Sequence, residues 1–184
     1  MGVTEVSIYD PLRDYPRKRH PIVTEQTSAD KVAEPGSAGK EKKKYHTGYI
    51  SGVWDLFHVG HLNIFKRAKE QCEYLIVGVV SDKGVIRFKG VAPFVPFEER
   101  IELVRACRYV DEAVEIPVEM NGPKEALAMY HFDVQFQGSD HMNEDYWIQM
   151  RDYLREHGAD MVFFPYTMST NSTNIKKLIE KKLV

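Results

Sequence analysis

The chain has 184 residues, of which 43% are hydrophobic and 28% are charged, and its formal net charge is -2. This length and apolar content suffice for one globular domain rather than two. A net charge so close to zero gives no field that would hold the protein on nucleic acid or on an anionic membrane, so we expect small-molecule ligands.

Two features bear on the compartment. The sequence contains two cysteines, Cys72 and Cys107, and neither lies in a metal-binding pattern. It has no apolar run approaching the roughly 18 residues of a membrane span, and no signal-like stretch at its N-terminus. We therefore expect a cytoplasmic protein that does not insert into a membrane.

Residues 1–45 carry the weakest structural signal. Several prolines and a lysine-rich run at 40–44 interrupt the segment, and no strand or helix period is sustained in it. We expect a flexible N-terminal extension, followed by one catalytic domain at 46–184. The alternative is a segment that docks on a partner domain or subunit through its apolar residues Ile8, Tyr9, Leu12 and Tyr15.

From residue 46 onward, segments with the periods of strands and helices alternate. Strand-like segments lie at 47–52, 74–80, 114–117, 134–137 and 161–165. Helix-like segments lie at 62–71, 123–130, 146–157 and 173–182. A further helix is expected to begin at Pro96 and to bury one face formed by Phe97, Ile101, Val104 and Cys107. Residues 85–95 are expected to form a loop. This alternation predicts an α/β fold with a Rossmann-like five-stranded parallel sheet and helices on both faces.

Two histidines, His58 and His61, stand three residues apart between the first strand and its helix. A loop in this position presents backbone N–H groups and the positive end of the helix dipole to the space above the sheet, which favours phosphate. The pair therefore indicates phosphate chemistry. The alternatives are half of a metal site, which would need further ligands, or an ordinary structural role.

This region resembles the HxGH nucleotidyltransferase superfamily, and within it the cytidylyltransferases that activate glycerol 3-phosphate, phosphocholine or phosphoethanolamine. Separate blocks carry the resemblance: Gly52–His61, Tyr74–Asp82, Phe88–Gly90, Glu99–Arg100, Arg108–Glu112, Gly138–Asp140 and Ser172–Thr173. The resemblance implies a sheet with the first strand in the centre. It also implies a homodimer.

The resemblance further implies transfer of CMP from CTP to a small phosphorylated alcohol, with release of pyrophosphate and with Mg²⁺ bound to the nucleotide. Such a reaction needs alignment and hydrogen-bond donors more than a strong base. The catalytic residues would be His58, His61 and Lys89. The nucleotide would contact both histidines and Val53, Trp54, Asp55, Gly138, Asp140, Ser172 and Thr173. The acceptor would contact Lys89, Arg100 and Lys124.

Several of these residues have a second interpretation. Arg100 either touches phosphate or holds the loop, and Asp55 either orders its loop or helps to place the metal-bound nucleotide. Ser172 and Thr173 either contact phosphate or simply cap the last helix.

One block departs from the family pattern. The cytidylyltransferases carry R-T-E-G-I-S-T-[ST], whereas this chain has Tyr166-Thr-Met-Ser-Thr-Asn-Ser-Thr173, without the arginine. Two other functions therefore stay open. One is an adenylyltransferase of the same superfamily with a sugar phosphate or a flavin as acceptor. The other is a catalytically weak nucleotide-binding sensor or partner domain.

Overall fold

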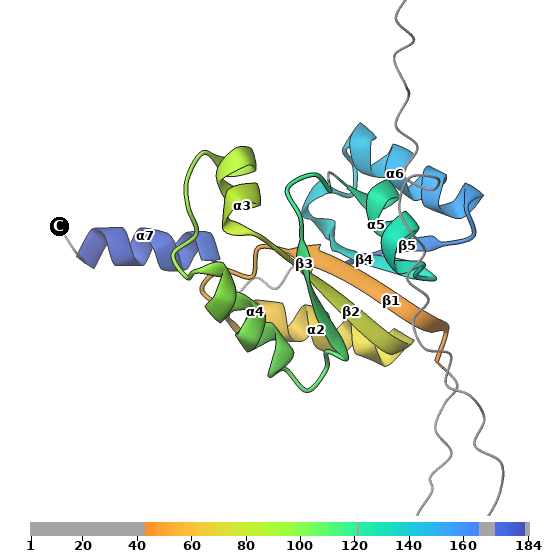
Figure 1. Ribbon diagram of the computed structural model, residues 1–184, viewed down its shortest axis with the longest axis horizontal. Coiled ribbons are helices and arrows are strands. Elements are labelled where there is room, and N and C mark those ends of the chain that lie inside the picture. The colour runs from red at the N-terminus through yellow and green to blue at the C-terminus, as the bar shows by residue number, and fades with distance from the viewer. Residues whose placement is uncertain (1–42, 121, 166–171, 183–184) are drawn as a thin grey trace, which may run out of the picture.

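The central feature of the fold is a parallel sheet of five strands in the order β3-β2-β1-β4-β5 (Figure 1). The computed structural model describes residues 43–120, 122–165 and 172–182. Its strands are β1 (Tyr45–Gly52), β2 (Cys72–Val80), β3 (Glu112–Ile116), β4 (Val134–Gly138) and β5 (Asp160–Phe164). The predicted sheet is thus confirmed, with the first strand in the centre. Tyr45, which was predicted to belong to the flexible extension 1–45, instead begins β1. The expectations for residues 1–42, including Ile8, Tyr9, Leu12 and Tyr15, lie outside the described residues.

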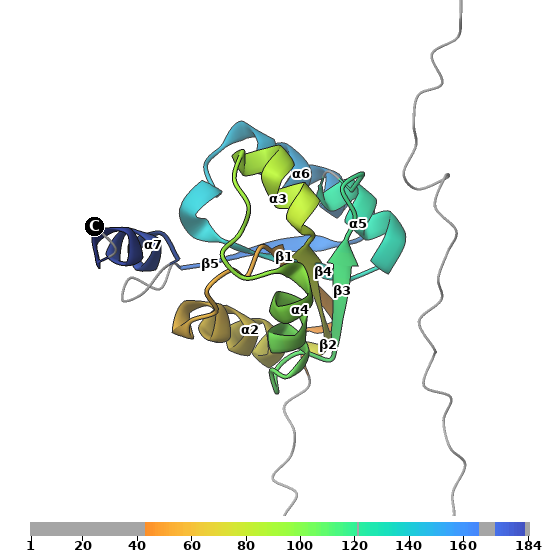
Figure 2. The same cartoon turned by 60° about the vertical axis from the view of Figure 1, so that its left-hand side comes forward.

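Helices cover both faces of the sheet, as predicted (Figure 2). On one face, α2 (Val59–Gln71) and α4 (Phe97–Arg105) pack against sheet residues such as Ile50 and Val77. On the other face, α5 (Pro123–Tyr130) and α6 (Asp145–Glu156) pack against Tyr49 and Ile76. Successive strand residues point to opposite faces, so each central strand contributes to both hydrophobic clusters.

The prediction of a loop at 85–95 is wrong for the first half of that segment, because α3 (Asp82–Lys89) occupies it. Ser81 caps this helix by accepting a hydrogen bond from the Gly84 N–H at 3.3 Å. Gly90 ends it in the left-handed conformation, with φ of 71°, which glycine adopts without steric cost. The loop therefore starts at Gly90, and Lys89 lies in the last turn of a helix.

Several helix boundaries also differ from the expectation. Helix α2 begins three residues earlier than predicted, directly after His58, which is its N-cap. Helix α4 ends at Arg105, so Cys107 lies beyond it and packs, half-buried, against the cluster formed with α2. The last helix, α7 (Ser172–Lys182), begins one residue early. In the described ranges, no helix is both long and apolar enough to span a membrane.

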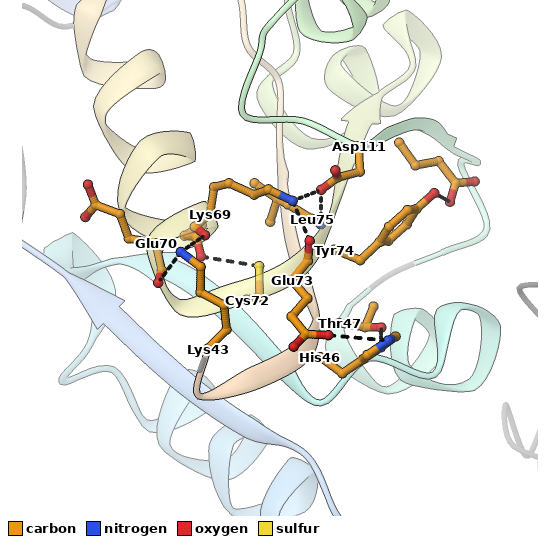
Figure 3. Close-up of polar contacts among 12 residues, drawn as sticks. Lys43, His46, Thr47, Lys69, Glu70, Cys72, Glu73, Tyr74, Leu75 and Asp111 are labelled. Atoms are coloured by element: carbon orange, nitrogen blue, oxygen red, sulfur yellow. Dashed lines mark hydrogen bonds and ion pairs between the residues drawn. The ribbon is translucent and has the colours of Figure 1, made fainter. Parts of the chain in front are cut away.

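A polar cluster fixes the amino ends of the strands, at the rim opposite the carboxyl ends (Figure 3). The Asp111 carboxylate accepts a hydrogen bond from the Leu75 N–H at 2.6 Å and pairs with Lys69 Nζ at 2.5 Å. Lys69 Nζ also donates to the Glu73 carbonyl oxygen at 2.5 Å. The cluster therefore joins the end of α2 to the start of β2 and to the turn that precedes β3.

Candidate active site

The carboxyl ends of β1 and β4, the start of α2 and the start of α7 enclose a cavity of about 340 Å³. We call it the histidine cavity. All the predicted site residues except Arg100 and Lys124 line it: Val53, Trp54, Asp55, His58, His61, Lys89, Gly138, Asp140, Ser172 and Thr173. The structure thus gathers residues from the two ends of the described chain at the sheet edge where ligands of parallel α/β folds bind.

His58 is held in one tautomer by the start of α2. The Gly60 N–H donates to its Nδ1 at 3.0 Å, so in the neutral ring Nε2 carries the proton. That Nε2 lies 3.3 Å from Ser172 Oγ, and the Ser172 hydroxyl donates in turn to the Asp55 carbonyl oxygen at 2.9 Å. Partial burial lowers the pKa of His58. The result is a neutral imidazole with a directed N–H donor in the wall of the histidine cavity.

His61 stacks on His58 with ring centroids 3.9 Å apart. Burial, reinforced by the neighbouring His58 and opposed by Asp55, lowers the pKa of His61 to about 3. Its Nδ1 is buried and has no hydrogen-bond partner among the described residues. Both rings of the pair are therefore neutral at pH 7, and one of them holds an unpaired ring nitrogen.

Backbone strain shapes the loop that carries these histidines. Trp54 and Leu56 have φ of 56° and 50°, a region that bulky residues rarely occupy. Trp54 is held there because its indole Nε1 donates to the Gly78 carbonyl oxygen at 2.8 Å and its ring packs edge-on against Phe65. The indole also lies 2.8 Å from where a Cβ on Gly52 would stand, so position 52 requires glycine.

Asp55 is the buried anchor of the same loop, with 3% of its surface exposed. Its carboxylate accepts hydrogen bonds from the Phe94 and Val95 N–H groups at 3.1 and 3.0 Å and pairs with Lys176 Nζ at 2.8 Å. Burial alone would raise the pKa of Asp55, but Lys176 and the two N–H groups together lower it below its ordinary value. The ionised Asp55 thus ties together the loop after β1, the loop before α4, and α7.

Arg100 lies beneath the histidine cavity rather than in its wall. Its side chain has no exposed surface. The guanidinium donates to the carbonyl oxygens of Val53, Val80 and Val95 and pairs with Asp82 at 2.6 Å. Of its two predicted roles, these contacts fit the loop-holding role and not contact with the acceptor.

Lys124, the other exception, lies on α5 with its Nζ 4.4 Å from the centroid of the Tyr153 ring. It is not among the residues that line the histidine cavity. This position of Lys124 therefore does not support the contact with the acceptor that the resemblance implied.

One family model matches most of the chain. That model is described as cytidylyltransferase-like and matches residues 49–181. The chain belongs to this cytidylyltransferase-like family of the HxGH nucleotidyltransferase superfamily.

Known proteins of different activities are similar to this cytidylyltransferase-like chain. A FAD synthase from Thermococcus kodakarensis is 34% identical over 144 residues, which cover 77% of this chain and 95% of that protein. An ethanolamine-phosphate cytidylyltransferase from Dictyostelium discoideum is 41% identical over 93 residues, which cover 50% of this chain and 26% of that protein. Membership of the nucleotidyltransferase superfamily is thus shown.

One solved structure shows the same fold. The lipopolysaccharide core biosynthesis protein from Thermoplasma volcanium has a TM-score of 0.55 and 20% sequence identity, and the match covers 67% of this chain and 97% of that protein. At this identity, the likeness supports the Rossmann-like architecture alone.

Two cations of this cytidylyltransferase-like site were missed in the sequence. Arg67 lines the histidine cavity from α2, and its guanidinium donates to the Pro165 carbonyl oxygen at 2.9 Å. Helical spacing could have indicated Arg67 as a cavity residue, because Gly60, Ile64 and Arg67 share the face of α2 that lines the cavity. Lys176, the partner of Asp55, gave no such signal because it depends on a contact between segments far apart in sequence.

The site has no described cluster suited to a resident metal ion. In residues 43–120, 122–165 and 172–182, no group of three or more His, Cys, Asp and Glu side chains is arranged to hold one. The carboxylates in the histidine cavity are those of Asp55 and Asp140, and both oxygens of Asp55 already accept hydrogen bonds.

Proposed function

We propose that this protein is an adenylyltransferase that transfers AMP from ATP to the phosphate of a flavin mononucleotide type of acceptor, with release of pyrophosphate. The similarity to the FAD synthase carries the choice of ATP and flavin, because it extends over 95% of that protein. The similarity to the ethanolamine-phosphate cytidylyltransferase extends over 26% of that protein. The histidine pair supports the reaction type.

In the proposed reaction, a phosphate oxygen of the acceptor forms a bond to the α-phosphorus of ATP. The bond from that phosphorus to the oxygen that bridges to the β-phosphate breaks, and pyrophosphate leaves with the electron pair. The attacking phosphate is ionised at neutral pH, so the protein needs to align it and to stabilise the charge that develops. We assign this stabilisation to His58, whose Nε2–H is held as a donor, and to His61, which is stacked beside it.

Three cations would balance the charge of the triphosphate. Lys89 reaches the histidine cavity from the end of α3, while Arg67 and Lys176 reach it from α2 and α7. Arg67 bonds to Pro165, directly before the segment in which the sequence lacks the family arginine. We propose that Arg67 supplies the positive charge that this arginine would supply. Ser172 and Thr173 remain proposed contacts of the β- and γ-phosphates.

We propose that Mg²⁺ enters with the triphosphate. The donor set of the cavity fits this mode of binding, since Asp55 is already fully engaged and Asp140 is the other cavity carboxylate. An ion held mainly by phosphate oxygens and water needs few protein ligands, and it neutralises charge on the phosphates. Activity should then depend on added magnesium and disappear with a chelator.

A second candidate is transfer of CMP to phosphoethanolamine. It is favoured by the higher local identity, 41% over 93 residues, to the ethanolamine-phosphate cytidylyltransferase. The chemistry at the histidines would be the same, and the base pocket and acceptor would differ.

A matrix of nucleotides and acceptors tests the proposal. ATP, CTP, GTP and UTP are each incubated with flavin mononucleotide, phosphoethanolamine, phosphocholine, glycerol 3-phosphate and a sugar phosphate, and pyrophosphate release is measured. We expect turnover with ATP and flavin mononucleotide. Turnover only with CTP and phosphoethanolamine would establish the second candidate. Nucleotide binding without turnover in any combination would favour a sensor or partner domain.

A further inference from the structure

A second cavity, of about 390 Å³, adjoins the histidine cavity. We call it the aromatic cavity. The two cavities share Ser51, Gly52, Val53 and Gln137, at the carboxyl ends of β1 and β4. A molecule whose phosphate lies beside His58 and His61 can therefore extend its remaining part into the aromatic cavity. The chemistry of this cavity bears on what that part is.

The aromatic cavity has no charged side chain among the described residues that line it. Its wall is formed largely by apolar and aromatic side chains: Phe88, Ile116, Met120, Tyr146 and Trp147. Phe88 and Tyr146 are 61% and 46% exposed, so apolar surface stands open to a ligand. A charged or hydroxyl-rich group would lose hydration here without gaining enough partners, whereas a planar apolar ring would gain contact with aromatic faces.

One polar atom in this cavity lacks a partner. Gln135 lines the cavity from β4 and is 1% exposed, and its Oε1 has no hydrogen-bond partner among the described residues. Buried acceptors are rarely left without a donor, because an unpaired polar group costs free energy. A ligand that carries an N–H group at its edge would satisfy this oxygen.

We propose that the aromatic cavity binds a planar heteroaromatic ring system with an edge N–H, and that Gln135 selects this ring by accepting a hydrogen bond from that N–H. The ring is the part of the acceptor that does not react. The inference rests on the proposed function, because the acceptor phosphate must lie at the histidines. It adds a specificity-determining residue and a chemical reason for excluding small, charged acceptors such as phosphoethanolamine.

The test compares two ligands on two proteins by isothermal titration calorimetry. The ligands are flavin mononucleotide and its analogue methylated at the ring imide nitrogen, and the proteins are the full chain and its Gln135→Met variant. Methionine keeps the size of the side chain and removes the amide. We expect Gln135→Met to weaken flavin mononucleotide binding about tenfold, and methylation to weaken binding to the wild type by a similar factor. The variant should not discriminate between the two ligands, which would show coupling between Gln135 and the imide N–H.

Three outcomes separate this inference from the proposed function. Equal affinity of both proteins for flavin mononucleotide, alongside normal adenylyl transfer, would overturn the role of Gln135 and leave the function intact. The expected coupling without pyrophosphate release from ATP would support the aromatic cavity and overturn the proposed reaction. Binding of phosphoethanolamine or phosphocholine that flavin mononucleotide cannot displace would overturn the inference. Thermal unfolding of Gln135→Met, monitored by circular dichroism, should show no loss of stability, because the variant removes an unpaired buried acceptor.

Discussion

The proposed chemistry of His58 and His61 depends on their being neutral. In the proposed reaction, the substrates place negative charge next to the two rings, and this charge increases at the α-phosphoryl oxygens and the leaving group in the transition state. A neutral imidazole with a fixed N–H donor attracts the ground-state substrate only weakly. It stabilises the transition state more strongly, because negative charge increases there. The two histidines should therefore affect turnover more than binding.

We predict that His58→Ala and His61→Ala each lower kcat by about a hundredfold or more, with a much smaller change in nucleotide affinity. Steady-state kinetics and calorimetric titration with ATP measure the two effects. The exposed His131, which ends α5 with a left-handed backbone, provides the control His131→Asn, which should leave kcat unchanged. Equal losses in kcat and in ATP binding would show that the histidines act as ground-state ligands.

Protein stability should fall as the pH is lowered, because His61 is buried in its neutral form. Its folded pKa of about 3 lies below the ordinary value of 6.5, so the unfolded chain binds an extra proton between these values. The free energy of unfolding is then lost progressively as the pH falls below 6.5. Allowing for the partial exposure of the ring, we expect a contribution on the order of 1 kcal/mol between pH 6.5 and pH 5.

Urea unfolding at several pH values measures this contribution. The slope of the free energy of unfolding with pH should be flatter in His61→Asn than in the wild type. His46→Asn, at an exposed histidine on the opposite rim, is the control for the removal of one histidine. A wild-type slope in both variants would mean that other groups cause the acid sensitivity.

At the level of elements, polar contacts attach α7 to the site. Lys176 reaches Asp55, and Ser172 reaches both His58 and the Asp55 carbonyl oxygen. The side chain of Leu178 is 58% exposed, so at this position the helix presents its apolar surface to solvent. The order of α7 should therefore depend on the ion pair more than on apolar packing.

We predict that Lys176→Met increases the exchange rate of the α7 amide hydrogens about tenfold, which corresponds to about 1.4 kcal/mol of local stability. The Asp55 carboxylate would keep its hydrogen bonds from the Phe94 and Val95 N–H groups, so the loop before α4 should stay protected from exchange. Hydrogen exchange followed by mass spectrometry resolves the two segments. Lys177→Met changes an exposed neighbour on the same helix. Identical exchange in the two variants would contradict the role of the ion pair.

The strands and most helices could be predicted because their periods are local. The apolar run of β2 and the 3.6-residue spacing of apolar side chains in α4 are local patterns, because the buried positions of each segment are the apolar ones. Helix α3 was missed because its centre, Gly84 and Val85, lies within a glycine-containing stretch of low helix propensity. Its ends carried the better signal, since Ser81 caps its start and Gly90 its end.

Within the site, most of the cavity residues could be predicted from the motifs, whereas Arg67, Lys176 and the geometry could not. The left-handed conformations of Trp54 and Leu56 depend on the Gly78 carbonyl oxygen and on Phe65, which belong to other elements. The burial of Arg100 likewise depends on carbonyl oxygens from three separate segments. Such contacts are set by tertiary packing and leave no periodic pattern in the sequence.

At the level of the whole molecule, the two rims of the sheet have separate tasks. The carboxyl ends of the strands carry both cavities, and the amino ends carry the Lys69 and Asp111 cluster (Figure 3). We predict that Asp111→Ala lowers the free energy of unfolding by about 1–3 kcal/mol, because the buried Leu75 N–H loses its acceptor. Turnover at 25 °C should be unchanged.

Chemical unfolding and steady-state kinetics on the same preparations test this separation. Glu102→Ala, which removes one partner of an exposed pair with Arg105 on α4, is the control and should cost less than about 0.5 kcal/mol. A fall in kcat in a still-folded Asp111→Ala protein would show that the two rims are coupled.

Assembly is a further prediction at this scale. The resemblance implies a homodimer formed near residues 108–112, which lead into the edge strand β3. Two-fold dimers are the commonest soluble oligomers. Light scattering at micromolar concentration should give the mass of two chains of 21.3 kDa. The mass of one chain would contradict the prediction.

The positions of the two tryptophans have a practical consequence. Trp54 stands in the wall of the histidine cavity, edge-on to His61, and Trp147 stands in the wall of the aromatic cavity. The emission of an indole changes when a charge or a ring is placed beside it, so each cavity contains its own spectroscopic probe. Trp147→Phe would leave Trp54 to report nucleotide arrival. Trp54→Phe would leave Trp147 to report the acceptor, so stopped-flow recordings of the two variants would give the order in which the substrates bind, without an added dye.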